Sequence, residues 1–214
     1  MAVLSRFTPD AYSASLVGLV FLAATYALGI ASARDAEVRN RGLALGGLFE
    51  SQPLSFKRVR HDFLRSLGFA LTAALLIFPP FIWAFVYWWH PNQEFHFRPP
   101  ESWNDEFIGQ ALVIALPEEA FYRGYLMDAF DRKSTRRVRL LGVDTGASLL
   151  WTSALFALGH LATEPNPARL AVFFPALLFG WLRLKTGGIG ASVLFHVLCN
   201  VFASSLGRGY GLWH

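Results

Sequence analysis

The chain has 214 residues, of which 54% are hydrophobic and only 16% are charged, and its net charge is +4. Soluble domains carry about 25% charged residues, so this composition excludes a disordered chain or a coiled coil and favours a membrane protein. A single cysteine excludes an intrachain disulfide framework and a cysteine-rich zinc site. The positive charge does not by itself indicate nucleic-acid binding, and we expect no nucleic-acid partner.

Six segments approach the roughly 20 mostly apolar residues that a transmembrane helix requires: 11–32, 66–89, 107–129, 146–163, 168–184 and 189–206. The first two are nearly free of charge, whereas the third contains Glu118, Glu119 and Arg123. We therefore predict an all-α, polytopic membrane helix bundle of about six transmembrane helices. Residues 1–106 would hold the first two helices and a basic cytosolic loop, and residues 107–214 the helical core formed by the last four.

The first segment is longer than the apolar run of about 7–15 residues in a signal peptide, so we interpret it as an uncleaved helix. In the connection that follows, apolar and basic residues interleave over 54–65. This pattern fits an interfacial helix on anionic lipid, or equally an ordinary basic cytosolic loop. In the second segment, Pro79-Pro80 predicts a kink.

Most of the 19 Lys and Arg residues lie in three connections, between segments one and two, three and four, and five and six. The positive-inside rule assigns such basic connections to the cytoplasm. We therefore predict that both termini, and any site opening on their side of the membrane, are extracytoplasmic.

The third segment carries ionisable groups at a depth where a charge costs about 2.5–3.5 kcal/mol. Glu119 and Arg123 are four residues apart, so they share a helix face and are expected to pair. This pairing leaves Glu118 unpaired within its own helix. If Pro117 breaks the helix, Glu118 begins a half-helix whose dipole favours an anion, and it could act as a general base. Alternatively, both acids only lock helices together.

Two histidines occur on later segments. His160 follows Phe156 by four residues, so the phenyl ring should pack beside the imidazole and fix it. His196 precedes Asn200 by four residues, which gives one helix face two donors suited to an oxyanion. Each histidine could instead be a hydrogen-bonded core residue. All of these groups, with Glu118, lie between the midplane and the outer surface, so we expect them to converge on a water-filled cavity.

Three motifs thus follow one another on successive segments: Glu118-Glu119-x-x-x-Arg123, Phe156-x-x-x-His160 and His196-x-x-x-Asn200. Together they resemble the signature of the CPBP family, the CAAX proteases and bacteriocin-processing proteins, also called the Abi family. This family includes the type II CAAX prenyl endopeptidases. The resemblance covers roughly residues 107–206, about half of the chain.

The resemblance implies a glutamic-type intramembrane endopeptidase that needs no cofactor and lies in a prokaryotic inner membrane. By analogy, Glu118 would activate the attacking water together with His160. His196 and Asn200 would stabilise the tetrahedral oxyanion.

The same analogy gives orienting roles to Glu119, Arg123 and Phe156. The substrate would be a membrane-associated protein. Because the charge pattern directs the site outward, an exported or C-terminally anchored tail fits better than a cytosolic CAAX tail. The oligomeric state is not indicated.

Three alternatives stay open. Glu118, His160 and His196 could be zinc ligands, although the H-E-x-x-H signature is absent. Ser192 or Cys199 could be a nucleophile activated by His196, although there is no nucleophile-elbow motif. The chain could also be a non-catalytic membrane scaffold, immunity or transport protein that uses the polar cluster for binding.

Overall fold

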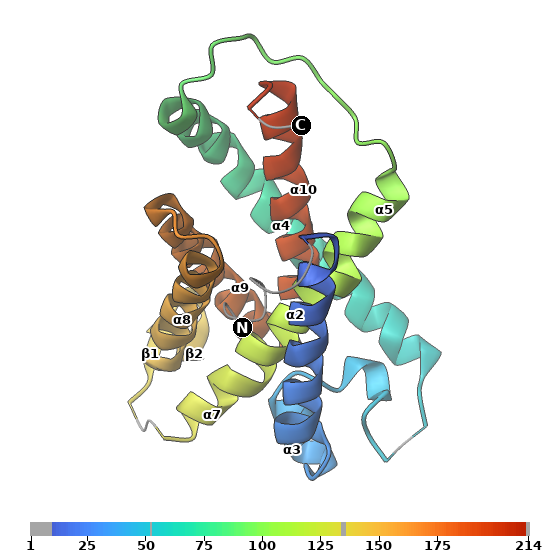
Figure 1. Ribbon diagram of the computed structural model, residues 1–214. Coiled ribbons are helices and arrows are strands. Elements are labelled where there is room, and N and C mark those ends of the chain that lie inside the picture. The colour runs from blue at the N-terminus through green and yellow to red at the C-terminus, as the bar shows by residue number, and fades with distance from the viewer. Residues whose placement is uncertain (1–9, 52, 134–135, 213–214) are drawn as a thin grey trace.

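The computed structural model describes residues 10–51, 53–133 and 136–212, and within these ranges the side chains from residue 14 onward. It is predominantly helical and confirms the predicted all-α class (Figure 1). The N-terminal half contains α2 (Asp10–Thr25), the π-helical turn η1 (Tyr26–Ile30), α3 (Asp35–Asn40), the 3-10 turn η2 (Leu45–Gly47) and α4 (Phe56–Trp89).

The C-terminal half begins with one continuous helical stretch made of five parts: α5 (Trp103–Ile108), η3 (Gly109–Ala115), α6 (Leu116–Glu119), η4 (Ala120–Leu126) and α7 (Met127–Asp131). Two short strands follow, β1 (Val138–Leu140) and β2 (Val143–Thr145), which pair antiparallel with Val138 opposite Thr145. The chain ends in α8 (Ser148–Thr163), the 3-10 turn η5 (Pro167–Val172), α9 (Phe173–Thr186) and α10 (Gly190–Gly209).

The second predicted span, 66–89, forms the C-terminal part of a longer helix. α4 extends over 34 residues and continues through Pro79 and Pro80 as a single element. Ser55 caps its start by accepting a hydrogen bond from the backbone N–H of Arg58 at 3.4 Å. The basic and apolar stretch over 54–65 is therefore mostly the first turns of α4, as the interfacial-helix interpretation requires.

The third predicted span, 107–129, alternates between α-helical and π-helical turns near Glu118 and Glu119. Proline has no N–H, so Pro117 cannot satisfy the carbonyl group four residues before it. The helix does not break there: it widens into the π-helical segment η3 and then resumes as α6, with right-handed helical angles at both boundaries. A π-helical turn is wider than an α-helical turn and can occur inside an α-helix without ending it. The condition under which Glu118 would begin a half-helix, a break at Pro117, is therefore not met.

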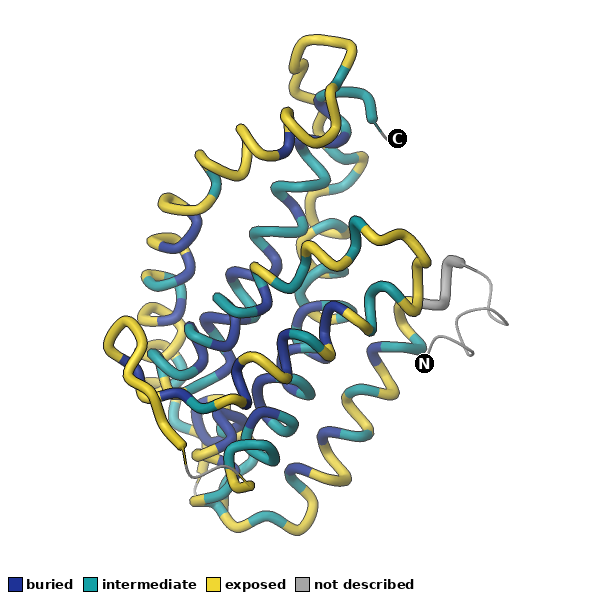
Figure 2. The backbone as a smooth tube through the Cα atoms, turned by 90° about the vertical axis from the view of Figure 1, so that its left-hand side faces the viewer, coloured by how far each residue is buried: buried dark blue, intermediate teal, exposed yellow. Residues whose placement is uncertain are grey.

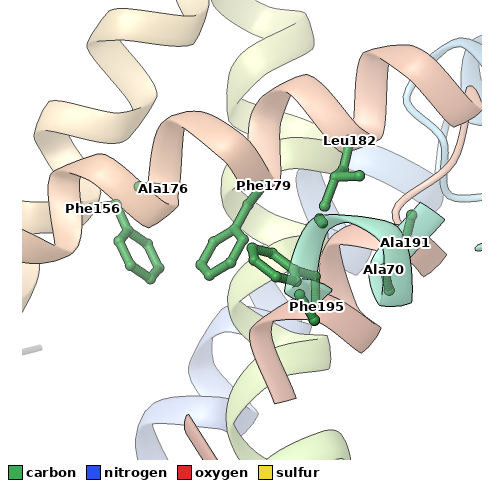
Figure 3. Packing of buried hydrophobic residues seen from close by; sticks show 9 residues of the cluster. Ala70, Phe156, Ala176, Phe179, Leu182, Ala191 and Phe195 are labelled. Atoms are coloured by element: carbon green, nitrogen blue, oxygen red, sulfur yellow. The ribbon is translucent and has the colours of Figure 1, made fainter. Parts of the chain in front are cut away.

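The core lies where α8, α9 and α10 meet α4. The rings of Phe156, Phe179 and Phe195 follow one another in a row, with centroid distances of 6.3 and 5.8 Å (Figure 3). Ala70 of α4 and Ala191 of α10 are fully buried, and their small side chains let the two helices approach closely. This packing fixes the helices that carry the two histidines.

The connection between α2 and α4 is docked into the bundle. Leu43 is 2% exposed and packs against Ala120 of η4 and Ile189, just before α10. Nε of Arg41 pairs with Oδ2 of Asp128 at 3.1 Å, where both side chains are largely buried. The basic loop predicted from the charge pattern therefore also contributes to the core.

Within the part of the chain that the structure describes, three helices are long and apolar enough to cross a membrane: 56–89, 167–186 and 190–209. Two shorter apolar helices cover 14–30 and 148–163. Large apolar side chains cover the outer surface of α4, which is exposed along most of its length (Figure 2). The chain is an integral membrane protein, and the count of six transmembrane helices remains a prediction.

The contact between α2 and η3 provides a test of this packing. A Cβ added at Gly18 would lie 2.5 Å from the carbonyl oxygen of Val113, whereas one added at Gly68 of α4 would meet nothing within 4 Å. Alanine is the better helix former at both positions by about 1 kcal/mol. We nevertheless expect Gly18→Ala to lower the free energy of unfolding by about 1–3 kcal/mol through overpacking.

The matched control, Gly68→Ala, should leave stability unchanged or raise it. Thermal unfolding of both variants in the same detergent measures the difference. Equal melting temperatures for the two variants would contradict the packing of α2 against η3.

Candidate active site

The acidic pair lies at the centre of the bundle, and its two carboxylates have different surroundings. Glu119 is completely buried. Its Oε1 lies 3.0 Å from Nδ1 of His196 and its Oε2 lies 3.3 Å from Nε of Arg123. The pairing of Glu119 with Arg123 expected from their spacing is confirmed. Glu119 therefore contacts two neighbouring side chains, His196 through a hydrogen bond and Arg123 through an ion pair.

Arg123, in η4, has a fully buried side chain, and its partners come from three other helical elements, α6, α8 and α9. Besides Glu119, its Nη2 donates a hydrogen bond to the carbonyl oxygen of Ala176 at 3.1 Å. Its guanidinium carbon lies 4.4 Å from the ring centroid of Phe156 and 5.3 Å from that of Phe179. Aromatic faces attract such cations, so these rings replace part of the lost hydration.

The imidazole of His196 lies between the two carboxylates. Its Nδ1–H donates to Glu119, and its Nε2 is 3.9 Å from Oε2 of Glu118. The ring is stacked on Phe179 at a centroid distance of 4.7 Å, and the edge of Phe156 contacts it at 5.8 Å. Ring packing and the hydrogen bond together fix the imidazole so that Nε2 faces Glu118.

Glu118 is the less constrained acid. Its side chain is 15% exposed, and its Oε2 has no hydrogen-bond partner among the residues that the structure describes. A carboxylate oxygen without a partner in a mostly buried position can accept a hydrogen bond from a water molecule. The sequence placed Glu118 beside His160, whereas the imidazole within 4 Å of it is that of His196.

His160 joins the cluster through Phe156. Its Nδ1–H donates to the carbonyl oxygen of Phe156 at 3.0 Å, and the two rings are 4.5 Å apart. The expected packing of Phe156 beside His160 is confirmed. Because the hydrogen bond holds the proton on Nδ1, Nε2 carries the lone pair and can accept a proton. Phe156 thus contacts both imidazoles and the guanidinium.

Asn200 lies one turn beyond His196 on α10, and its partner was not foreseen from the sequence. Its Nδ2 donates to Oε1 of Gln110 in η3 at 2.7 Å. The sequence feature that could have indicated this partner is Gln110 itself, a single amide side chain in an apolar segment, eight residues before Glu118. The hydrogen bond uses one of the two N–H groups of the Asn200 amide and leaves the other for a ligand.

The alternative nucleophiles are placed less favourably. Ser192 is completely buried, and its hydroxyl donates to the carbonyl oxygen of Phe179 at 2.7 Å. Cys199 packs against the apolar core cluster. Within the described residues, no three His, Cys, Asp or Glu side chains are grouped so that they could hold a metal ion. The zinc arrangement of Glu118, His160 and His196 therefore lacks geometric support.

A cavity of about 1180 Å³ adjoins the cluster at Asn200. It lies between α4, the β1–β2 hairpin, the start of α8, the η5–α9 segment and α10, and most of its lining is apolar. Arg169 also lines it and pairs with Glu164, Nε to Oε2, at 3.2 Å. Its main apolar walls are Phe78, Phe81, Leu178, Trp181 and Phe202.

Residues 102–202 match the model of a protein family described as type II CAAX prenyl endopeptidase Rce1-like. The matched region contains all of the motif residues discussed above, from Glu118 to Asn200, as well as Gln110. No curated protein and no solved structure matches the chain.

The different surroundings of the two acids predict different effects on stability. Glu119→Gln leaves Arg123 without its carboxylate in a fully buried position, and breaking such a pair costs about 3–5 kcal/mol. Glu118→Gln removes no hydrogen bond within the described residues, so we expect a change below about 1 kcal/mol. Thermal unfolding in detergent compares the two variants.

The double variant Glu119→Gln/Arg123→Met removes both charges and should regain part of the stability lost in Glu119→Gln. If Glu118→Gln is as destabilising as Glu119→Gln, the assignment of Glu119 as the structural partner is wrong.

Proposed function

Because residues 102–202 belong to the type II CAAX prenyl endopeptidase Rce1-like family, a family of membrane proteases, we propose that this protein is a glutamic-type intramembrane endopeptidase. In this proposal, a water molecule activated by Glu118 hydrolyses a peptide bond of a membrane-associated protein. The observation that carries the proposal is the contrast between the two acids. The oxygens of Glu119 lie 3.0 and 3.3 Å from nitrogens of His196 and Arg123 in a fully buried position, whereas Glu118 is 15% exposed and its Oε2 lies 3.9 Å from His196.

The first step is attack by water on the peptide carbonyl carbon. The Glu118 carboxylate accepts a proton from the water as the new C–O bond forms, which is general base catalysis. His160 assists through Nε2, the nitrogen that its hydrogen bond to Phe156 leaves free to accept a hydrogen bond from the same water. When the C–N bond breaks, the proton passes from Glu118 to the leaving amine.

The negative charge on the carbonyl oxygen needs donors that are already in position. Asn200 supplies the N–H that its hydrogen bond to Gln110 leaves free. As the imidazolium, which carries a proton on each ring nitrogen, His196 donates from Nδ1 to Glu119 and from Nε2 toward Glu118 and the reacting atoms. Glu119, Arg123 and the aromatic rings position these groups and do not themselves react.

The cavity at Asn200 supports a substrate with an apolar segment. Its volume of about 1180 Å³ exceeds the roughly 300–1,000 Å³ of small-molecule pockets, and its lining is largely apolar. The distribution of basic residues directs the site toward the extracytoplasmic side. We therefore favour an exported protein with a membrane-anchored tail or leader as the substrate, with a CAAX-type tail as the alternative.

The central test is proteolysis by variants of the proposed reacting groups. We expect Glu118→Gln and His160→Ala each to abolish processing, because each removes a proton acceptor from the water. A strain lacking the gene, complemented with each variant, is examined by mass spectrometry for membrane proteins that are shortened only by the wild type.

Ser192→Ala and Cys199→Ala serve as controls for the nucleophile alternatives and should retain processing. Wild-type levels of shortened product from Glu118→Gln would disprove the proposed mechanism, provided that the variant protein reaches the same level in the membrane.

Gln110 provides a second test, as a positioning residue. Gln110→Leu removes the acceptor for the Asn200 amide, and the loss of about one hydrogen bond, roughly 1 kcal/mol, should lower kcat about fivefold to tenfold with little effect on KM. Gln110→Glu keeps an acceptor oxygen and should restore most of the rate. Equal rates for both variants, or a change in KM alone, would show that Gln110 does not orient Asn200.

A further inference from the structure

A second cavity, of about 570 Å³, lies between the loop before α4, the first turns of α4 and the turn that joins α9 to α10. The proposed catalytic side chains do not line it. Its walls come from the segments 39–50, 58–66 and 186–194, together with Leu116. The charge pattern assigns the first two segments and the α9–α10 turn to the cytoplasmic side, so this cavity is separate from the proposed protease site.

Cations surround the mouth of this cavity, and a buried acid holds two of them in place. The side chain of Glu50 is 1% exposed and pairs with Arg39 at 2.8 Å and with Arg58 at 3.3 Å. The two arginine side chains are still 53% and 46% exposed, so each keeps donors that face solvent. Glu50 therefore positions two guanidinium groups without covering them.

A third cation, Arg65, completes the mouth. It donates to the carbonyl oxygens of Thr186 and Lys185, at 3.1 and 3.3 Å, and remains exposed. Among the described residues, the acids that line the same cavity are Glu50 and Asp62, against the three arginines. The mouth thus has an excess of positive charge and suits an anion.

The floor of the cavity has the opposite character. Ile189, just before α10, and Val193 and Leu194 of α10 line it, and Phe63 of α4, which is 52% exposed, extends the apolar lining toward the mouth. Gly46 adopts a φ of +75°, and a Cβ there would lie 2.3 Å from the side chain of Val59. The loop can close over α4 this tightly only because it has glycine at that point. The cavity is therefore apolar inside and cationic at its mouth.

We propose that this cavity binds the headgroup of an anionic phospholipid. The phosphate would pair with Arg39, Arg58 and Arg65, and the apolar part of the lipid would lie against Phe63 and Leu194. α4 supports the placement of this cavity at the membrane surface, because its exposed side chains are basic and amphipathic over 56–65 and mostly apolar over 71–89. The apolar floor favours a lipid over a soluble phosphate.

The test measures lipid retention by native mass spectrometry of the purified full chain, incubated with phosphatidylglycerol or phosphatidylcholine. We expect the wild type to retain phosphatidylglycerol in preference to phosphatidylcholine. Each arginine near an anionic headgroup contributes about 1 kcal/mol, so Arg65→Gln should reduce the retention of phosphatidylglycerol about fivefold. Arg39→Gln/Arg58→Gln should reduce it more.

Arg60→Gln is the matched control, because Arg60 is exposed on the same helix but does not line the cavity. Its retention should equal that of the wild type, and a loss as large as that of Arg65→Gln would show general surface attraction and overturn the proposal. Asp62→Asn tests the opposite sign: it removes an exposed acid from the lining and should raise retention about fivefold.

A competition arm distinguishes the source of the phosphate. Inorganic phosphate in excess should not displace bound phosphatidylglycerol, because it cannot use the apolar floor. Displacement at concentrations comparable to those of the lipid would assign the cavity to a soluble phosphate. Equal retention of phosphatidylcholine and phosphatidylglycerol would likewise overturn the proposal.

Discussion

The bundle depends on one buried cation. Arg123 is completely inaccessible to solvent, in a position where an unpaired charge would cost several kcal/mol. Its partners come from different elements: the carboxylate of Glu119 from α6, a backbone carbonyl oxygen and the Phe179 ring from α9, and the Phe156 ring from α8. No pair of helices can satisfy the guanidinium alone. Its burial therefore requires these helices to assemble in one arrangement, and that arrangement brings the histidine-bearing helices to the acidic pair.

The burial of Arg123 also gives two adjacent glutamates, Glu118 and Glu119, different surroundings. Glu119 contacts both Arg123 and His196, so its movement would deprive one buried group of its counter-charge and the other of a hydrogen bond. Glu118, one residue earlier, has a free oxygen and partial exposure. The two imidazoles are likewise distinguished by the acceptor at Nδ1, which is a carboxylate for His196 and a backbone carbonyl oxygen for His160. In the proposed mechanism, these different environments would let one residue of each kind hold its neighbours and the other transfer protons.

The local part of this arrangement could be predicted from the sequence, because it depends on spacing along one helix. The pairing of Glu119 with Arg123 and the packing of Phe156 on His160 both follow from a separation of four residues. The contact of Glu118 with His196 could not be predicted, because it depends on how α6 and α10 rotate against each other. The winding of η3 before Pro117 was missed because the sequence does not show whether a proline breaks a helix or widens it. In both cases, tertiary packing determined which of several possible local arrangements formed.

Helices that line the two cavities also carry the proposed reacting groups. Leu116 lines the phospholipid cavity and precedes Glu119 by three residues, and Val193 lines it and precedes His196 by three residues. One helical turn therefore separates the apolar floor of that cavity from the ion pair that fixes the imidazole. Because tightly packed helices move as rigid elements, a lipid that fills the cavity acts on the same two helices that carry the carboxylates and His196. In this arrangement, a bound lipid would support the geometry of the site through a cavity that is separate from the one proposed to receive the substrate.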